Sequence, residues 1–168
     1  WVNNPGWTWR TPFGAGRAAA DDEPAVHIGF DEAQAFCRWA GARLPAEAEW
    51  EKGARGTDAR LYPWGEREPD SVLLNFGRGS KRGATTPVGA HPDGSSPYGL
   101  LDMVGNVWEW VSSAYAAYPY RAGDGRDPFR LSRRGRETVS PQRLLRQLNR
   151  ACETDSRPPC AVTGLGAG

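Results

Sequence analysis

The sequence contains few of the residues that build most disulfide frameworks and metal centres. Among 168 residues there are three cysteines, two histidines and one methionine. Three cysteines cannot form the dense disulfide framework of small secreted domains, and their odd number assigns no redox compartment. Because His27 and His91 are the only histidines, a three-histidine zinc site and an HExxH metalloprotease helix are both excluded.

The chain also lacks a charge excess and a long hydrophobic run. Its 21 Lys and Arg against 20 Asp and Glu leave a formal net charge of +1. Nucleic acids and anionic membranes both attract a concentrated basic surface. No stretch approaches the roughly 18 apolar residues of a membrane-spanning helix. We therefore expect no nucleic-acid partner and no membrane span, and the sequence assigns no cellular location.

What the sequence does have is glycine, proline and aromatic residues. Its 21 glycines and 14 prolines come close to the share that is typical of low-complexity chains. Eight Trp, five Tyr and five Phe argue against disorder, because disordered chains contain few aromatic residues. The length suits one domain with a sizeable core. The composition thus predicts a compact, loop-rich domain.

A first helix is predicted over residues 31–41. Asp31 can cap its start, with Gln34 three residues later, and a glycine, Gly41, follows as the stop signal. Phe36 and Trp39 fall on one stripe of this helix, which we expect to face the core.

A second helix is predicted over residues 46–55. Glu51 and Arg55 have the i,i+4 spacing of a side-chain ion pair. Glu47 and Glu49 lack a nearby nucleophile or acid in the sequence, so the three glutamates are interpreted as surface charge.

Extended structure is predicted at residues 25–30 and 107–111, and a short helical turn at residues 100–106. In a strand over 107–111, Trp108 and Trp110 would share one face. A domain with few regular elements needs large side chains to fill its core. We therefore expect four tryptophans to be mostly buried: Trp39, Trp50, Trp108 and Trp110.

Four sequence blocks, in a fixed order, identify a family. They are HIGFDEAQAFCRWAGARLPAEAEWEKGARG, YPWG, TTPVG and SPYGLLDMVGNVWEW. Together they resemble the formylglycine-generating enzyme, or sulfatase-modifying factor, family. The resemblance implies an α+β fold, a loop-rich variant of the C-type-lectin-like fold with few regular elements. It also implies that residues 1–168 are the C-terminal part of one such domain, with the N-terminal portion missing before Trp1.

The resemblance puts the family's central chemistry in doubt. Formylglycine generators hold copper(I) with two cysteines that follow an RGGS motif, and here residues 134–137 read RGRE. The two cysteine positions fall on Ser140 and Leu145, so copper is not expected, because copper(I) favours soft thiolate ligands. Trp108 matches the tryptophan of the family's oxygen-binding pocket, but Glu137 replaces the serine that accompanies it.

The resemblance also implies structural calcium. Mixed carboxylate and carbonyl oxygens suit this ion, which takes six to eight hard ligands. One implied site uses the side chains of Asp102 and Glu109 with the carbonyls of Gly105 and Val107. A second implied site uses Asn75 and the carbonyl of Phe76. The alternative is that Asp102 caps the turn and Glu109 is solvated.

The remaining cysteines and histidines suggest less. Cys152 and Cys160 are either a displaced metal pair or ordinary thiols near the chain end. Cys37 follows a helical aromatic residue and is interpreted as a buried thiol. His27 is expected to be packed and hydrogen-bonded, and His91 to be exposed in a turn.

Three functions remain open. The first is a binding module that presents a peptide, protein or small molecule with exposed aromatics of its YPWG and AYAAYPY stretches. The second is the pocket-forming domain of an oxygen-dependent oxidoreductase, as in ergothioneine-type sulfoxide synthases, which carry this domain behind an iron-binding bundle. A His-x3-His-x-Glu sequence upstream would identify it. The third is an authentic formylglycine generator with a divergent C-terminal third.

Overall fold

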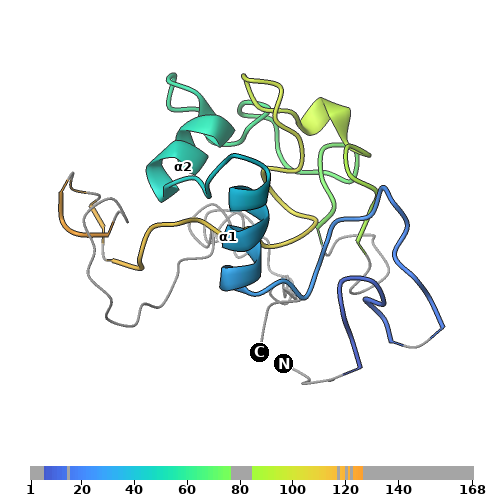
Figure 1. Ribbon diagram of the computed structural model, residues 1–168. Coiled ribbons are helices and arrows are strands. Elements are labelled where there is room, and N and C mark those ends of the chain that lie inside the picture. The colour runs from blue at the N-terminus through green and yellow to red at the C-terminus, as the bar shows by residue number, and fades with distance from the viewer. Residues whose placement is uncertain are drawn as a thin grey trace.

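Two short helices are embedded in long, ordered turns. In the computed structural model the helices are α1 (Phe30–Trp39), α2 (Glu47–Arg55) and a 3-10 turn, η1 (Pro92–Gly94) (Figure 1). The structure describes residues 6–14, 16–76, 85–116, 118–119, 121 and 123–126. These ranges contain no strand, and an isolated bridge joins Tyr62 to Gly65. The loop-rich character is confirmed, whereas the β part of the α+β fold stays a prediction.

Helix α1 forms where the sequence predicts it, within two residues at each end. Its N-terminus is capped by the carboxylate of Glu32, which accepts the Gly29 N–H at 2.6 Å. Asp31 and Gln34, the predicted cap pair, do not have this role. The helix ends at Trp39, and Gly41, two residues later, has the left-handed φ of 69°. The Ala42 N–H then reaches back to the Cys37 carbonyl at 2.8 Å, as in a Schellman motif.

Helix α2 starts within one residue of the prediction. The Glu49 carboxylate accepts the Ala46 N–H at 2.8 Å and two bonds of 2.7 Å from the Arg43 guanidinium. The bonds from Arg43, followed by that from Ala46, lower the pKa of Glu49 to about 2. The predicted pair between Glu51 and Arg55 is confirmed at 2.8 Å. Both pairs lie near the surface, where such contacts contribute little to stability.

The core lies around Tyr62, in the turn that follows α2. Trp64 stacks on Tyr62 with ring centroids 5.2 Å apart, and Tyr62 is 1% exposed. The expectation that the YPWG aromatics are exposed is therefore wrong: Tyr62 is a core residue. The buried cluster contains Tyr62, Leu73, Leu74 and Val104, with Leu61, Trp64 and Phe76 packed against it.

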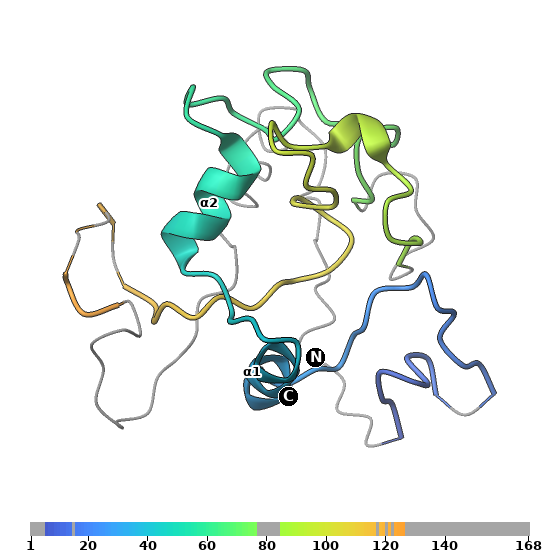
Figure 2. The same cartoon turned by 45° about the horizontal axis from the view of Figure 1, so that its top comes forward.

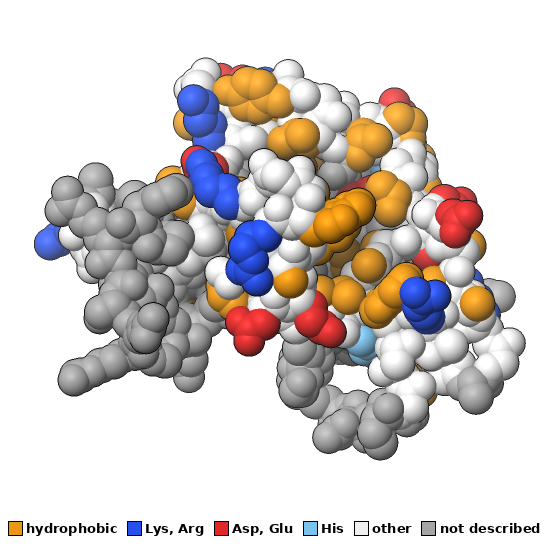
Figure 3. Space-filling view, in the orientation of Figure 1, with side chains coloured by type: hydrophobic (Ala, Val, Ile, Leu, Met, Phe, Trp, Pro, Cys, Tyr) orange, Lys and Arg blue, Asp and Glu red, His pale blue; other side chains and the backbone are white. Residues whose placement is uncertain are grey.

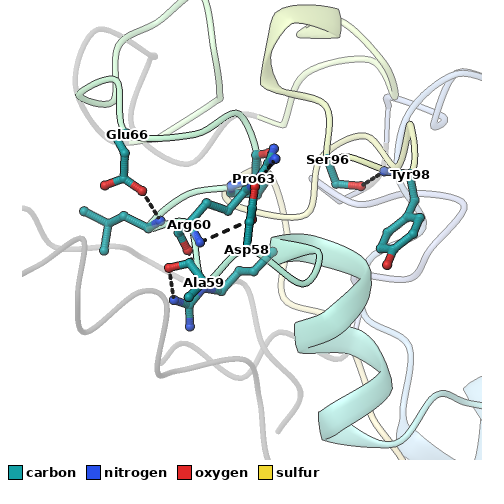
Figure 4. Close-up of polar contacts among 9 residues, drawn as sticks. Asp58, Ala59, Arg60, Pro63, Glu66, Ser96 and Tyr98 are labelled. Carbon is teal, nitrogen blue, oxygen red and sulfur yellow. Dashed lines mark hydrogen bonds and ion pairs between the residues drawn. The ribbon is translucent and has the colours of Figure 1, made fainter.

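Arginine side chains hold the chain that leads into this turn (Figure 4). Arg55 donates to the Arg60 carbonyl at 2.7 Å, and the Arg60 guanidinium binds the Asp58 carboxylate. The bonds from Arg60 lower the pKa of Asp58 to about 2. Glu66 accepts the Leu61 N–H at 2.8 Å. These contacts close the loop on itself and direct the next side chain, that of Tyr62, inward.

Three predictions of local structure are wrong. Residues 25–30 and 107–111 do not form strands, and residues 100–106 do not form a helical turn. Left-handed backbone lies within residues 25–30, where φ is 58° at His27, and within residues 100–106, where φ is 53° at Asp102. The pair Gly105–Asn106, with φ of 85° and 58°, directly precedes residues 107–111. A residue in this conformation cannot continue either a strand or a right-handed helix.

The predicted burial of tryptophan is also wrong in part. Trp39 is 82% exposed and Phe36 is 64% exposed, so this stripe of α1 faces away from the described core. Trp50, Trp108 and Trp110 are half-buried. At the opposite end of α1, the Phe30 ring packs edge-on against the Trp110 ring, and the two ring centroids are 5.7 Å apart.

Candidate functional site

A single irregular segment, residues 102–113, joins the separate parts of the molecule. It crosses between α1 and α2 (Figure 2). The Trp110 indole donates to the Ile28 carbonyl at 2.9 Å, just before α1. The Ser112 N–H donates to the Pro45 carbonyl at 2.8 Å, just before α2. Residues that are far apart in sequence therefore meet along this segment.

The first half of the segment is a tight turn held by Asn106. The Asn106 N–H donates to the Asn75 carbonyl at 2.9 Å. Its side-chain oxygen accepts the Thr86 N–H at 3.0 Å, and its amide nitrogen donates to the Thr86 carbonyl at 3.1 Å. An added Cβ at Gly105 would lie 2.5 Å from the same Asn75 carbonyl. The turn is thus pinned to two other loops and requires glycine at its tip.

Two carboxylates flank this turn, and the charge of Asp102 acts on Glu109. Burial raises the pKa of Glu109, a hydrogen bond from the Trp50 indole opposes that effect, and the Asp102 carboxylate raises the pKa further. Asp102 itself accepts the Gly89 N–H at 2.9 Å. Each carboxylate thus holds one hydrogen bond from a neighbouring loop or helix. Asp102 therefore lies close enough to Glu109 for its negative charge to act on that carboxyl group. A cation bound here would neutralise this charge.

The other predicted site residues lie around the same turn. The Asn75 amide nitrogen is 3.3 Å from the Asn106 side-chain oxygen, and Phe76 packs against the core cluster. Trp108 and Val107 are both half-buried. In the part of the chain that the structure describes, no three His, Cys, Asp or Glu side chains gather as a metal site. A cation here would therefore need backbone carbonyls among its ligands.

Sequence reasoning missed Trp50 and Glu47, which α2 directs toward the same segment. Trp50 hydrogen-bonds Glu109, and the Glu47 N–H donates to the Ser113 hydroxyl at 2.8 Å. The Glu47 side chain is 13% exposed, so its interpretation as surface charge is wrong. Residues 47, 50 and 54 share one helix face, and the burial of Ala54 marks that face as the inner one.

The cysteine and histidine predictions have mixed outcomes. Cys37 is a half-buried free thiol. His27 is packed as predicted, with Nε2 3.1 Å from the Pro12 carbonyl. His91 is half-buried, with Nδ1 3.1 Å from the Val72 carbonyl, so its predicted exposure is wrong. Five residues of the copper, oxygen-pocket and cysteine predictions lie outside the described residues: Glu137, Ser140, Leu145, Cys152 and Cys160.

Comparison with known proteins gives a family match over almost the whole chain. The model of the sulfatase-modifying factor enzyme 1-like domain matches residues 1–161. A hercynine oxygenase from Mycolicibacterium smegmatis is 47% identical over 124 residues, 69% of this chain and 27% of that protein. A formylglycine-generating enzyme from Mycobacterium tuberculosis is 42% identical over 135 residues, 74% of this chain and 44% of that protein.

A solved structure shares the fold. PvdO from Pseudomonas aeruginosa superposes with a TM-score of 0.52 at 28% identity, covering 68% of this chain and 47% of that one. The chain thus spans less than half the length of these relatives. No helix within the described ranges is long and apolar enough to cross a membrane.

Proposed function

The chain belongs to the sulfatase-modifying factor enzyme 1-like family, and we propose that it is a formylglycine-generating-enzyme-like binding scaffold that does not generate formylglycine. The feature that carries this proposal is the pair Ser140 and Leu145, which stand where the family resemblance puts the copper ligands. A serine hydroxyl is a hard, protonated donor at neutral pH, and leucine has no donor atom. Copper(I), which favours soft thiolates, does not fit this donor set.

Family membership alone does not determine the chemistry. Relatives of similar identity include one named as a hercynine oxygenase and one named as a formylglycine-generating enzyme. The same scaffold therefore accompanies different activities. We further propose that the complete fold is the α+β, C-type-lectin-like variant that the sequence blocks imply.

A scaffold of this kind binds through loops held on a small core. Three tyrosines on described loops are 38–59% exposed: Tyr98, Tyr115 and Tyr118. Tyrosine has a large apolar ring, few rotatable bonds and a polar tip, which makes it effective in binding a peptide, protein or small molecule. These residues replace the YPWG aromatics as the candidate binding surface.

The first test is for formylglycine itself. The chain should leave the cysteine of a sulfatase-type peptide unchanged after incubation with copper(I) and oxygen, as measured by mass spectrometry. The physical reason is that no thiolate pair stands where copper must be held. In addition, the resemblance puts Glu137 in place of the serine that accompanies the family's oxygen-pocket tryptophan, which is Trp108 here.

The Mycobacterium tuberculosis relative provides the positive control for this assay. Conversion of the thiol to an aldehyde above a protein-free control would contradict the proposal. Loss of that activity in a Cys152→Ser, Cys160→Ser variant would then assign copper to the displaced pair.

We also propose that Asp102 and Glu109, with the carbonyls of Gly105 and Val107, hold a calcium ion. The support is electrostatic: burial, and in addition the Asp102 carboxylate, raise the pKa of Glu109, and a cation at this place would offset both effects. A bound calcium ion would supply the positive charge and order the turn. We propose Asn75 and Phe76 as a second, weaker site.

Calcium should raise the melting temperature of the chain, and chelation should lower it. A ligand present at a hundredfold excess over Kd adds about 2.7 kcal/mol to the free energy of unfolding. For a chain of this size, that is roughly 5–10 °C. Glu109→Gln should remove most of this response, because it removes one anionic ligand. Differential scanning calorimetry with and without chelator measures the shift.

The pH dependence provides a control. Because its folded-state pKa is raised, Glu109 stabilises the fold below its ordinary pKa of 4.5, and that contribution is lost as pH rises through the folded value. In chelator at neutral pH, Glu109→Gln should therefore melt higher than the original chain, and with calcium it should melt lower. Glu68→Gln, at an exposed position, should do neither. Equal melting with calcium and chelator would refute the site.

A second candidate function is the pocket-forming domain of an oxygen-dependent oxidoreductase. The 47% identity to a hercynine oxygenase favours it. This function also requires no copper cysteines in the domain, so Ser140 and Leu145 are compatible with it. The sequence of the complete reading frame would distinguish the two candidate functions. A His-x3-His-x-Glu sequence before Trp1 would identify the oxidoreductase.

A further inference from the structure

Helix α2 carries a tryptophan whose indole bonds a carboxylate of the calcium site proposed above. The Trp50 indole N–H donates to Oε2 of Glu109, 59 residues further along the chain. Among the described residues, the indoles of Trp64 and Trp110 donate instead to backbone carbonyls. A charged carboxylate is a stronger hydrogen-bond acceptor than a neutral carbonyl. The bond from Trp50 therefore holds one oxygen of the Glu109 carboxylate in place.

The other carboxylate of the site is held in the same way. Oδ2 of Asp102 accepts the Gly89 N–H at 2.9 Å. Each carboxylate thus has one oxygen bound to a donor of the protein. Among the described residues, no hydrogen bond reaches the second oxygen, which is Oδ1 of Asp102 and Oε1 of Glu109. The protein fixes both groups through one oxygen and leaves the other oxygen of each to a ligand.

Two backbone carbonyls on the same turn complete a set of oxygens without donors. In the part of the chain that the structure describes, no backbone N–H donates to the carbonyl of Gly105 or Val107. The four residues that supply these oxygens are all half-buried. The acidic side chains visible in Figure 3, by contrast, are scattered among basic and hydrophobic ones. Two carboxylate and two carbonyl oxygens fit calcium, which takes hard oxygen ligands and completes its shell with water.

A second contact keeps the Trp50 indole in register with Glu109. One turn before Trp50 on α2, the Glu47 N–H donates to the Ser113 hydroxyl at 2.8 Å, and Ser113 is 0% exposed. Helix α2 is therefore fixed to the segment on the far side of Glu109 as well. The indole N–H is presented by a helix that cannot slide along this segment without breaking a buried bond.

We propose that Trp50 is a positioning residue for the calcium site: its indole N–H holds Oε2 of Glu109 so that Oε1 stays available to the ion. The inference rests on the calcium site of the proposed function. Donors that bond a metal ligand through its other polar atom fix its orientation, and their removal typically weakens metal binding by roughly 10–100-fold. Without the bond from Trp50, the Glu109 side chain would be free to adopt other rotamers.

Calcium binding to the full chain, measured by isothermal titration calorimetry, tests this role. Trp50→Phe keeps an aromatic ring but has no N–H, so it should weaken calcium binding about tenfold or more. Trp50→Gln loses the ring but keeps an N–H at the same number of bonds from Cα, so it should bind calcium more tightly than Trp50→Phe. Because glutamine leaves a larger cavity, Trp50→Gln should nevertheless melt lower. Affinity and stability thus change in opposite directions, which a purely structural role of Trp50 does not allow.

Trp110→Phe is the matched control. Trp110 is the neighbour of Glu109 in sequence, and its indole also donates a hydrogen bond, at 2.9 Å, but to the Ile28 carbonyl. Its substitution should lower the melting temperature and leave the calcium affinity unchanged. Far-UV circular dichroism of each variant confirms that it is folded.

A measurement on the unaltered chain does not depend on how the variants fold. In the ¹H–¹⁵N NMR spectrum, the Trp50 indole signal should shift when calcium is added, because its acceptor is a ligand of the ion. The Trp64 indole, which donates to the Arg67 carbonyl at 2.8 Å, should not shift. Equal shifts of the two signals would contradict the proposal.

The outcomes separate the role of Trp50 from the calcium site itself. If the original chain binds no calcium, both proposals are wrong. If Glu109→Gln abolishes calcium binding but Trp50→Phe binds as tightly as the original chain, the site stands and the role of Trp50 is overturned. Equal weakening by Trp50→Phe and Trp110→Phe, or by Trp50→Phe and Trp50→Gln, would also overturn it, because lost packing would then explain the effect.

Discussion

Replacing Arg126 with methionine should lower the free energy of unfolding by about 1–3 kcal/mol. The Arg126 side chain is 2% exposed. Its Nε and Nη2 atoms lie 2.7 and 2.6 Å from the Asp124 carboxylate, and Nη1 lies 3.7 Å from Glu47. Methionine keeps most of the volume but removes the charge, so two carboxylates lose their counter-ion. Denaturant unfolding followed by tryptophan fluorescence measures the change.

A double-mutant cycle separates this electrostatic effect from packing. Glu47→Gln removes one of the carboxylates, so the double variant should be less destabilised than the sum of the single variants. Arg67→Met is the matched control, because Arg67 pairs with Asp70 at the surface and such pairs contribute about 0–1 kcal/mol. A loss below about 1 kcal/mol in Arg126→Met would show that the buried cluster does not stabilise the fold.

The helices could be predicted because their signals are local. Gly41 closes α1 through the Ala42 N–H, and Glu51 pairs with Arg55 one turn apart. Each of these contacts depends on residues within a few positions of one another. The same is true of the loop-rich character, which follows from the content of glycine and proline.

The segment at residues 100–106, and with it the start of the predicted strand at 107, could not be predicted correctly, because left-handed residues interrupt the chain there. Asp102 and Asn106 are not glycine, yet both adopt positive φ. Asn106 does so while bonding Asn75 and Thr86, which are 31 and 20 residues away in sequence. Such contacts exist only in the folded chain, so alternation of side chains along residues 107–111 is an insufficient signal.

The site residues divide in the same way. The sequence blocks indicate Asp102 and Glu109 through family resemblance, and the structure places them in electrostatic range. Trp50 carries no local sign that it will bond Glu109, because the two are 59 residues apart. The sequence around Glu47 likewise carries no sign of burial, because its buried partner, Arg126, lies in a distant loop.

Gly105→Ala should be the most damaging small substitution in the candidate site. Gly105 has a φ of 85°, and an added Cβ would lie 2.5 Å from the Asn75 carbonyl oxygen. Positive φ costs an alanine about 1–2 kcal/mol, and overpacking against a rigid neighbour adds about 1–3 kcal/mol. We expect a loss of about 2–5 kcal/mol in the free energy of unfolding, measured by denaturant titration in chelator.

Gly99→Ala isolates the close approach from the backbone strain. Gly99 has a similar φ of 73°, but nothing lies within 4 Å of an added Cβ. Its substitution should therefore cost only the conformational part, about 1–2 kcal/mol. The excess loss in Gly105→Ala measures how firmly the turn is held on Asn75. If calcium binds this turn, the same variant should also lose its calcium-dependent rise in melting temperature, because the Gly105 carbonyl moves with the displaced backbone. Equal losses in free energy of unfolding in the two variants would mean that the turn shifts without cost to accommodate the added methyl group. A turn that shifts so easily could not hold Asp102 and Glu109 in a preformed site.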